Sequence, residues 1–222
     1  TFNSTPVATI NTTSTGQHTW DITTLVADWV SGAKSNYGVL VGSPDGGGNR
    51  KATYDSREGS TKPVLEITYT IPVFTWDGGA GTNNWGDANN WSDNKVPTSC
   101  ENVSLTGANT IDINVAGTCR NITINNASLV LTVKSGQSLT VGEGLTMSNG
   151  TLKTEASFPT VSGTTSLSGG TVSYSASSGS QTVAALTYNN LTIEGGGTKT
   201  LAGTAYVAGN ITVSAGTFDL GS

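Results

Sequence analysis

Four tetrapeptides repeat one pattern of asparagine, apolar, hydroxyl and apolar residues: Asn102-Val103-Ser104-Leu105, Asn121-Ile122-Thr123-Ile124, Asn190-Leu191-Thr192-Ile193 and Asn210-Ile211-Thr212-Val213. Their starting positions differ by 19, 69 and 20, and the long interval of 69 is about three periods of 23. Related strands at 138–141 and 145–147 fill that interval. A repeat of roughly 20 residues, with alternating apolar residues and no helical spacing, is typical of a β-solenoid, in which short strands stack turn upon turn.

A second repeat marks the corners between strands. The segments 147–152, 167–172 and 213–218 each place a strand, a two-residue corner and another strand in the same order. Residues 101–222 are therefore predicted to form a right-handed parallel β-helix of about six turns. The residues predicted to point inward are Val103, Leu105, Ile122, Ile124, Leu139, Val141, Leu191, Ile193, Ile211 and Val213. An antiparallel sandwich is the alternative, because a corner such as Asn149-Gly150 also suits a hairpin.

The composition agrees with an all-β chain. Charged residues make up 11% of the 222 residues, whereas about 25% is usual for soluble domains. The chain holds 37 Thr and 25 Ser, which favour strands and turns, and 29 Gly. The net charge is -5 and no cluster of Lys or Arg occurs, so a nucleic-acid partner is excluded. No apolar run approaches the ~20 residues that span a bilayer, which argues against membrane insertion.

A group of Trp, Asn and Asp residues precedes the repeats: Phe74-Thr75-Trp76-Asp77-Gly78-Gly79, Asn84-Trp85, Ala88-Asn89-Asn90-Trp91-Ser92 and Val96-Pro97. With the repeats that follow, residues 74–222 resemble the parallel β-helices of secreted bacterial and archaeal surface adhesins. Residues 72–100 are predicted to be the segment that leads into the solenoid and caps it.

Residues 1–71 have a different pattern. Strands are expected at 6–10, 18–22, 37–41, 52–55 and 64–69, and a helix at 24–30, followed by Gly32. The blocks that begin at Trp20, Asn36, Tyr54 and Pro63 resemble the C-terminal half of DNRLRE-type jelly rolls. The resemblance implies a partial β-sandwich over residues 1–71 and carbohydrate binding. Separately, the loop at 43–50, followed by Asp55, Arg57 and Glu58, is a weaker candidate site for calcium or sugar, and salt bridges and turn formation explain these residues equally well.

The two cysteines, Cys100 and Cys119, are separated by one period of the repeat, which corresponds to one turn. Stacked turns bring such residues to the Cα separation of a disulfide, about 4.4–6.8 Å. A disulfide between them is predicted, and it would indicate an oxidising compartment. Two buried free thiols are the alternative.

The tryptophans Trp76, Trp85 and Trp91 lie close together in the sequence. Three interpretations are open: a platform on which sugar rings stack, a calcium site with ligands such as Asp77 and Asp87, or a plug for the end of the solenoid. Calcium is the only cofactor that the sequence suggests.

No catalytic constellation is found. His18 is the only histidine, and residues 101–222 hold Arg120 as the only arginine, so the paired acids and basic partners of a lyase or glycosidase are missing. Gly195-Gly196-Gly197 reads as a corner loop. We expect a non-enzymatic, secreted or cell-surface structural protein: a filament, sheath or adhesin stalk whose partners are other copies of itself. A carbohydrate-binding region of a larger secreted protein, with surface glycans as partners, is the alternative, and a lyase is a third. Both ends are expected to expose unpaired strand edges, which other copies would complete.

Overall fold

The computed structural model describes residues 5–10, 16–42, 58–60 and 62–221. The chain divides into two compact units, Thr1–Ile67 and Thr68–Ser222, which are described separately. No helix in these described ranges is long and apolar enough to cross a membrane.

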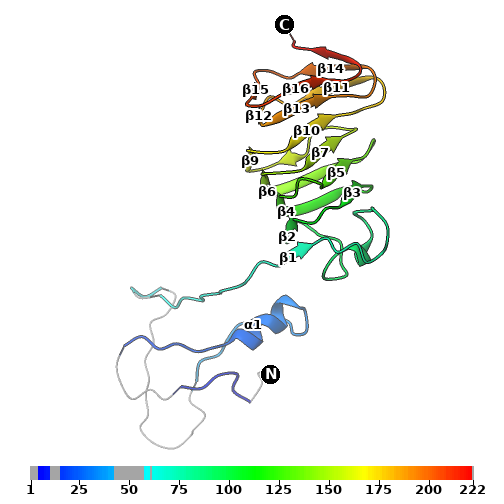
Figure 1. Ribbon diagram of the computed structural model, residues 1–222. Coiled ribbons are helices and arrows are strands. Elements are labelled where there is room, and N and C mark those ends of the chain that lie inside the picture. The colour runs from blue at the N-terminus through cyan, green and yellow to red at the C-terminus, as the bar shows by residue number, and fades with distance from the viewer. Residues whose placement is uncertain (1–4, 11–15, 43–57, 61, 222) are drawn as a thin grey trace, which may run out of the picture. The chain divides into compact units, whose positions relative to one another are not determined.

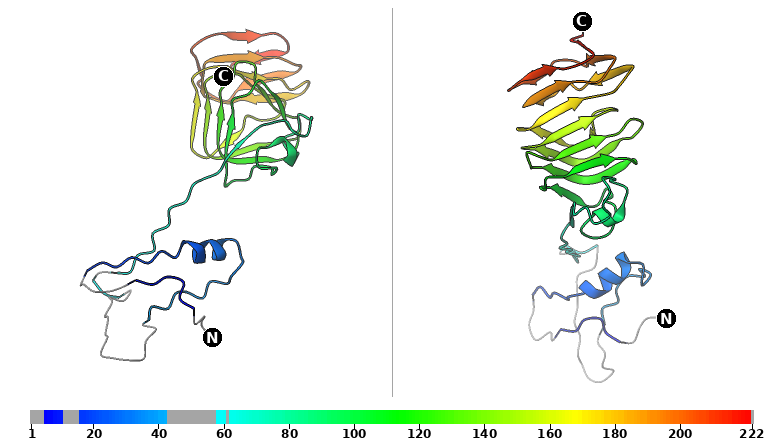
Figure 2. Two further views of the ribbon diagram at one scale, coloured as in Figure 1. Left: turned by 60° about the horizontal axis from the view of Figure 1, so that its bottom comes forward. Right: turned by 45° about the vertical axis from the view of Figure 1, so that its right-hand side comes forward.

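The second unit is a parallel β-helix of about six turns (Figure 1). Two six-stranded sheets form its sides, with the orders β1-β2-β4-β6-β8, in which β9 also pairs with β6, and β16-β13-β10-β7-β5-β3. Two smaller sheets, β11-β14-β17 and β12-β15, complete the later turns. Every strand pair in these sheets is parallel, so the antiparallel sandwich is wrong. Figure 2 shows the strands stacked in flat layers along one axis. The strands are β1 (Val73–Thr75), β2 (Asn102–Leu105), β3 (Thr110–Ile113), β4 (Gly117–Ile124), β5 (Val130–Val133), β6 (Leu139–Met147), β7 (Thr151–Thr154), β8 (Thr160–Val161), β9 (Thr164–Leu167), β10 (Thr171–Tyr174), β11 (Ser180–Val183), β12 (Thr187–Tyr188), β13 (Asn190–Ile193), β14 (Thr198–Leu201), β15 (Tyr206–Val207), β16 (Ile211–Val213) and β17 (Thr217–Asp219).

The core consists of columns of apolar side chains, one residue from each turn. In the sheet that contains β7, the pairing aligns one inward position on all six strands: Ile111, Leu131, Leu152, Val172, Leu191 and Ile211. The first five of these side chains are buried. Alternation along each strand sends every second residue inward, which is why short Thr- and Val-rich strands suffice to fill the interior.

Eight of the ten residues predicted to point inward are buried. The exceptions are Ile211 and Val213, which are 56% and 50% exposed. Both lie on β16, the last strand of its sheet, so no further turn in the described residues packs against them.

The tetrapeptide repeat is used on two different sides of the solenoid. Asn102 pairs with Asn121 in the sheet of β2 and β4, as their separation by one period predicts. Asn190 lies instead in β13, in register with Thr171 of β10. The interpretation of the long interval as three periods of one column is therefore wrong. Both sides need the same alternation of inward and outward residues, so the pattern does not identify the side.

Asparagines form ladders between turns. The Asn121 side-chain amide donates to Asn102 Oδ1 at 3.0 Å, and the Asn149 amide donates to Asn125 Oδ1 at 3.0 Å. A nearby corner is narrow: a Cβ on Gly170 would lie 2.4 Å from the Gly150 carbonyl oxygen, and both glycines have positive φ. These corners hold adjacent turns in register.

The described residues of the first unit contain one helix, α1 (Thr23–Val30), which agrees with the helix expected at 24–30. The strands expected at 6–10, 18–22, 37–41 and 64–69 are not formed in the described residues, and the strand expected at 52–55 lies outside them. The apolar side chains of 37–41 and 64–69 are largely exposed, among them Tyr37 at 94% and Val64 at 84%. No described strand pairs with these segments, so the jelly-roll arrangement of residues 1–71 stays a prediction.

Candidate functional site

The three tryptophans before the repeats form the cap of the solenoid. Trp85 and Trp91 are 0% exposed, and their rings meet edge to face with centroids 4.6 Å apart. Trp76 packs against Trp91 in the same way at 5.2 Å, and the Trp91 indole donates to the Trp85 carbonyl at 2.9 Å. Enclosed rings have no free face on which a sugar could stack. The arrangement of Trp85 and Trp91 therefore fits the plug and not the sugar platform.

The two aspartates proposed as calcium ligands instead shape turns. Asp77 Oδ1 accepts the amide of Gly79 at 2.9 Å, and Asp87 Oδ1 accepts the amide of Asn89 at 3.2 Å. Within the described residues, no group of three or more His, Cys, Asp or Glu side chains could hold a metal ion. Of the other two weak candidates, Arg57 lies outside the described residues and Glu58 is exposed.

Both cysteines are free thiols, so the predicted disulfide is absent. Cys119 is buried in β4, whereas Cys100 is exposed in a turn just before β2 begins. The one-turn spacing is correct, but the turn takes Cys100 out of the ladder and its side chain away from the core. Burial raises the pKa of the Cys119 thiol to about 12. Cys100 instead lines a shallow hollow of about 400 Å³ with Arg120 and Glu143.

A larger cavity, of about 550 Å³, lies at the corner that joins the sheet of β7 and β10 to β11. We call it the corner pocket. It is lined by Ser135, Glu155, Ala156, Ser157, Ser175, Ala176, Ser177, Ser178, Ser180, Gln181 and Thr182. Seven of these residues carry hydroxyl groups and none is aromatic. Within the part of the chain that the structure describes, only the Ser175 hydroxyl among them makes a hydrogen bond, to the Thr154 carbonyl at 3.2 Å.

Gln181 fixes the shape of the corner pocket from inside the solenoid. Its side chain is 6% exposed and points inward. The amide nitrogen donates to the carbonyls of Thr154 at 2.8 Å and Ala156 at 2.7 Å, and the amide oxygen accepts from the Ala176 nitrogen at 3.1 Å. One side chain thus ties two successive corner loops together, and three hydrogen bonds, one of them buried and two partly buried, leave the loop at 175–180 little freedom.

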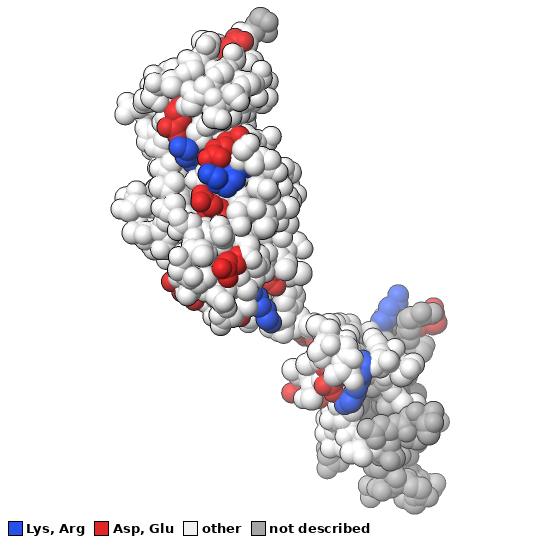
Figure 3. Space-filling model, turned by 90° about the vertical axis from the view of Figure 1, so that its right-hand side faces the viewer, with Lys and Arg blue, Asp and Glu red and all other residues white. Residues whose placement is uncertain are grey.

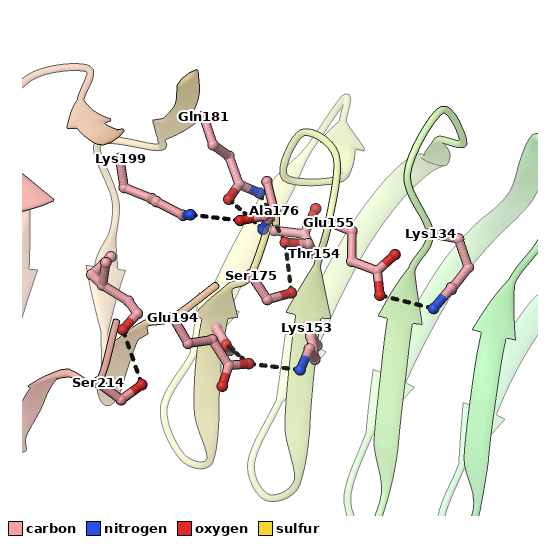
Figure 4. A network of polar contacts seen from close by, with 12 residues as sticks. Lys134, Lys153, Thr154, Glu155, Ser175, Ala176, Gln181, Glu194, Lys199 and Ser214 are labelled. Atoms are coloured by element: carbon pink, nitrogen blue, oxygen red, sulfur yellow. Dashed lines mark hydrogen bonds and ion pairs between the residues drawn. The ribbon is translucent and has the colours of Figure 1, made fainter. Parts of the chain in front are cut away.

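Lys199 has the same role in the next turn of the solenoid. It is in register with Gln181 and is 0% exposed. Its Nζ donates to the Ala176 carbonyl at 2.7 Å and to the Gly196 carbonyl. Figure 4 shows both side chains converging on Ala176. Desolvation lowers the pKa of Lys199, because burial disfavours the charged form, while Glu194 opposes that effect.

Glu155, which lines the corner pocket, forms an ion pair, and a second ion pair joins Lys153 of β7 to Glu194, which follows β13. Lys134 Nζ lies 2.8 Å from Glu155 Oε1, and Lys153 Nζ lies 2.7 Å from Glu194 Oε1. Burial alone would raise the pKa of Glu155, but the hydrogen bonds from Lys134 and from the Ser135 amide outweigh it, so the pKa is lowered. Lys153 likewise lowers the pKa of Glu194. Figure 3 shows positive and negative side chains next to one another in the middle of this face of the solenoid, with a few further charged side chains elsewhere on it.

The sequence does not single out this pocket, although one signal is visible in it. The run Ser175-Ala176-Ser177-Ser178-Gly179-Ser180 is the densest cluster of serines in the chain. Gln181 and Lys199 occupy inward positions of their strands, where a polar residue is unexpected. The alternation of apolar and polar residues does not indicate that their side chains would bind the backbone of a corner loop.

Comparison with known protein families gives two matches. A model of carbohydrate-binding module family 96 matches residues 1–69, which supports the carbohydrate-binding resemblance of the N-terminal region. A model described as a domain of unknown function, DUF8693, matches residues 75–214 and so covers most of the solenoid. No curated protein and no solved structure matches the chain.

Proposed function

The chain belongs to the DUF8693 family, and we propose that it is an extracellular cell-surface protein in which a carbohydrate-binding region is joined to a solenoid stalk. The observation that carries the proposal is the match of residues 1–69 to carbohydrate-binding module family 96. Such a module supports an extracellular location, because glycans are displayed on cell surfaces and in secreted polymers.

The solenoid suits the role of a stalk. Its stability is close to a sum of contacts between neighbouring turns, so it can present a binding region without a large globular core. Glu155, the one ionisable residue that lines the corner pocket, is paired with Lys134, which leaves no cluster of free acids there for glycosidic bond cleavage. The proposal therefore assigns no catalytic step to the chain.

The finer statement within the proposal is that this protein is an adhesin stalk or a filament subunit. It is supported by the regular parallel stack, in which the edge of each turn pairs with the next turn. Unpaired strand edges pair readily with another copy. Light scattering of the full chain over a range of concentrations distinguishes a stable monomer from open-ended association.

Among the described aromatic residues of the first unit, Tyr37 is the one best placed to contact a sugar, because the residue is 94% exposed. Exposed aromatic rings offer an apolar face to a pyranose ring. The test is a glycan array probed with the full chain and with Tyr37→Ala. Tyr206→Ala is the matched control, since Tyr206 is 69% exposed but lies in the solenoid. We expect saturable binding that weakens in Tyr37→Ala and persists in Tyr206→Ala. Absence of saturable binding to any glycan would refute the proposed function.

A further inference from the structure

The corner pocket has the properties of a binding site whose lining is already in place. Its volume of about 550 Å³ falls in the usual range for small-ligand pockets, about 300–1,000 Å³. The buried Gln181 and Ser175 side chains bind backbone carbonyls of the turn below, which holds the loop at 175–180 in one arrangement. A lining that is ordered before the ligand arrives loses little entropy on binding.

The free polar groups of the corner pocket are hydroxyls. The side chains of Ser135, Ser157, Ser177, Ser178, Ser180 and Thr182 make no hydrogen bond to other described residues. A hydroxyl is both a donor and an acceptor, so this lining matches a ligand that also presents many groups of that kind. Sugars are such ligands.

The charges around the pocket narrow the class of ligand. Glu155 is its only ionisable lining residue, and that carboxylate is paired with Lys134 and accepts the Ser135 amide at 3.2 Å. One paired carboxylate makes a poor site for a divalent cation, which prefers several free oxygen ligands. An acidic sugar would need an unpaired cation, but the Lys199 ammonium is directed at the Ala176 carbonyl. Of these classes of ligand, a neutral polyol fits the corner pocket best.

We propose that the corner pocket of the solenoid binds a neutral hexose oligosaccharide. This site is separate from the region that matches the carbohydrate-binding module, so the chain would hold a glycan at two places. Two weak sites on one chain raise the overall affinity for a polymer, because the second contact forms at high effective concentration. Hydrogen bonds to the six free hydroxyls carry the recognition, since the pocket has no aromatic ring on which a sugar could stack.

The test is a titration of the isotope-labelled full chain, followed by the backbone amide resonances of residues 155–157 and 175–182. The probes are glucose-, mannose- and galactose-based neutral hexose oligosaccharides, with an oligogalacturonate as the acidic comparison and calcium chloride as the cation comparison. The triple variant Ser157→Ala, Ser180→Ala, Thr182→Val removes three exposed hydroxyls and keeps the strand. The control variant Thr146→Val, Ser166→Ala removes two exposed hydroxyls that are paired in register on β6 and β9, outside the pocket.

We expect saturable shifts at the pocket amides with at least one neutral probe, and about a tenfold or greater loss of affinity in the triple variant, because each neutral hydrogen bond contributes a few-fold to binding. The control variant should bind as the natural chain does. Well-dispersed amide signals in both variants show that each is folded. The proposal is overturned if none of the neutral probes shifts these amides, if the triple variant binds as tightly as the control, or if calcium or the acidic probe shifts them instead. Each of these outcomes leaves binding by the N-terminal region, measured through Tyr37→Ala, unaffected.

Discussion

Replacing Leu152 by alanine should destabilise the solenoid far more than the same truncation at Ile211. Both residues occupy one column of the sheet that contains β7, but Leu152 is 0% exposed between Leu131 and Val172, whereas Ile211 is 56% exposed. Leu→Ala removes three carbons at about 0.8 kcal/mol each, roughly 2.4 kcal/mol. The cavity left between two fixed turns adds to that, for a total of about 3–4 kcal/mol. About half of the Ile211 side chain is already in water, so Ile211→Ala should cost about 1 kcal/mol.

Urea denaturation measures this difference. Far-ultraviolet circular dichroism follows the strands, and tryptophan fluorescence follows the cap at Trp85 and Trp91. The slope of the free energy of unfolding against urea should be unchanged in both variants, because neither alters the area exposed on unfolding. Equal losses of stability in the two variants, or a loss below about 1 kcal/mol for Leu152→Ala, would contradict a stack in which each turn covers the next.

Three further predictions follow from the site. Thiol titration of the native protein should find one reactive thiol, that of Cys100, because Cys119 is buried and its pKa is raised. Titration of the denatured, unreduced chain should find two, and finding none there would show that the two cysteines form a disulfide. Gln181→Leu should cost about 2–3 kcal/mol in urea denaturation, since it leaves the Ala156 carbonyl and the Ala176 amide unpaired, whereas Thr182→Val should be close to neutral. The folded-state pKa of Glu155 is below its usual value of 4.5, so the stability that this carboxylate contributes is present above pH 4.5 and is lost as the pH falls through the folded pKa. In Glu155→Gln, the melting temperature should therefore depend less on pH in that acidic range.

The fold was largely predictable because its signal is local. Alternation within each strand and a period of roughly 20 residues favour a stack of short parallel strands. The pairing of Asn102 with Asn121 follows directly. The side on which each repeat lies was not predictable. Asn190 carries the same motif on another sheet, because both sides bury every second residue.

The corner pocket could not be predicted for a different reason. It depends on Gln181 and Lys199, whose partners are backbone carbonyls from the same or an adjacent turn, and carbonyls have no signature in the sequence. A buried lysine in an alternating strand is costly unless a partner is present, so the pattern alone argues against it. The predicted disulfide is not formed, because the spacing of two residues shows that they are one solenoid turn apart but not where their side chains point. Cys100 lies in a loop before β2, outside the ladder of paired strands.

The central claim is that this chain binds carbohydrate, and calorimetric titration of the full chain with the glycans that score highest on an array tests it most directly. The account predicts a saturable heat of binding that is weakened by Tyr37→Ala and unchanged by Tyr206→Ala. A chain that shows the circular dichroism of a folded β protein and yet gives no saturable heat with any of these glycans would contradict it.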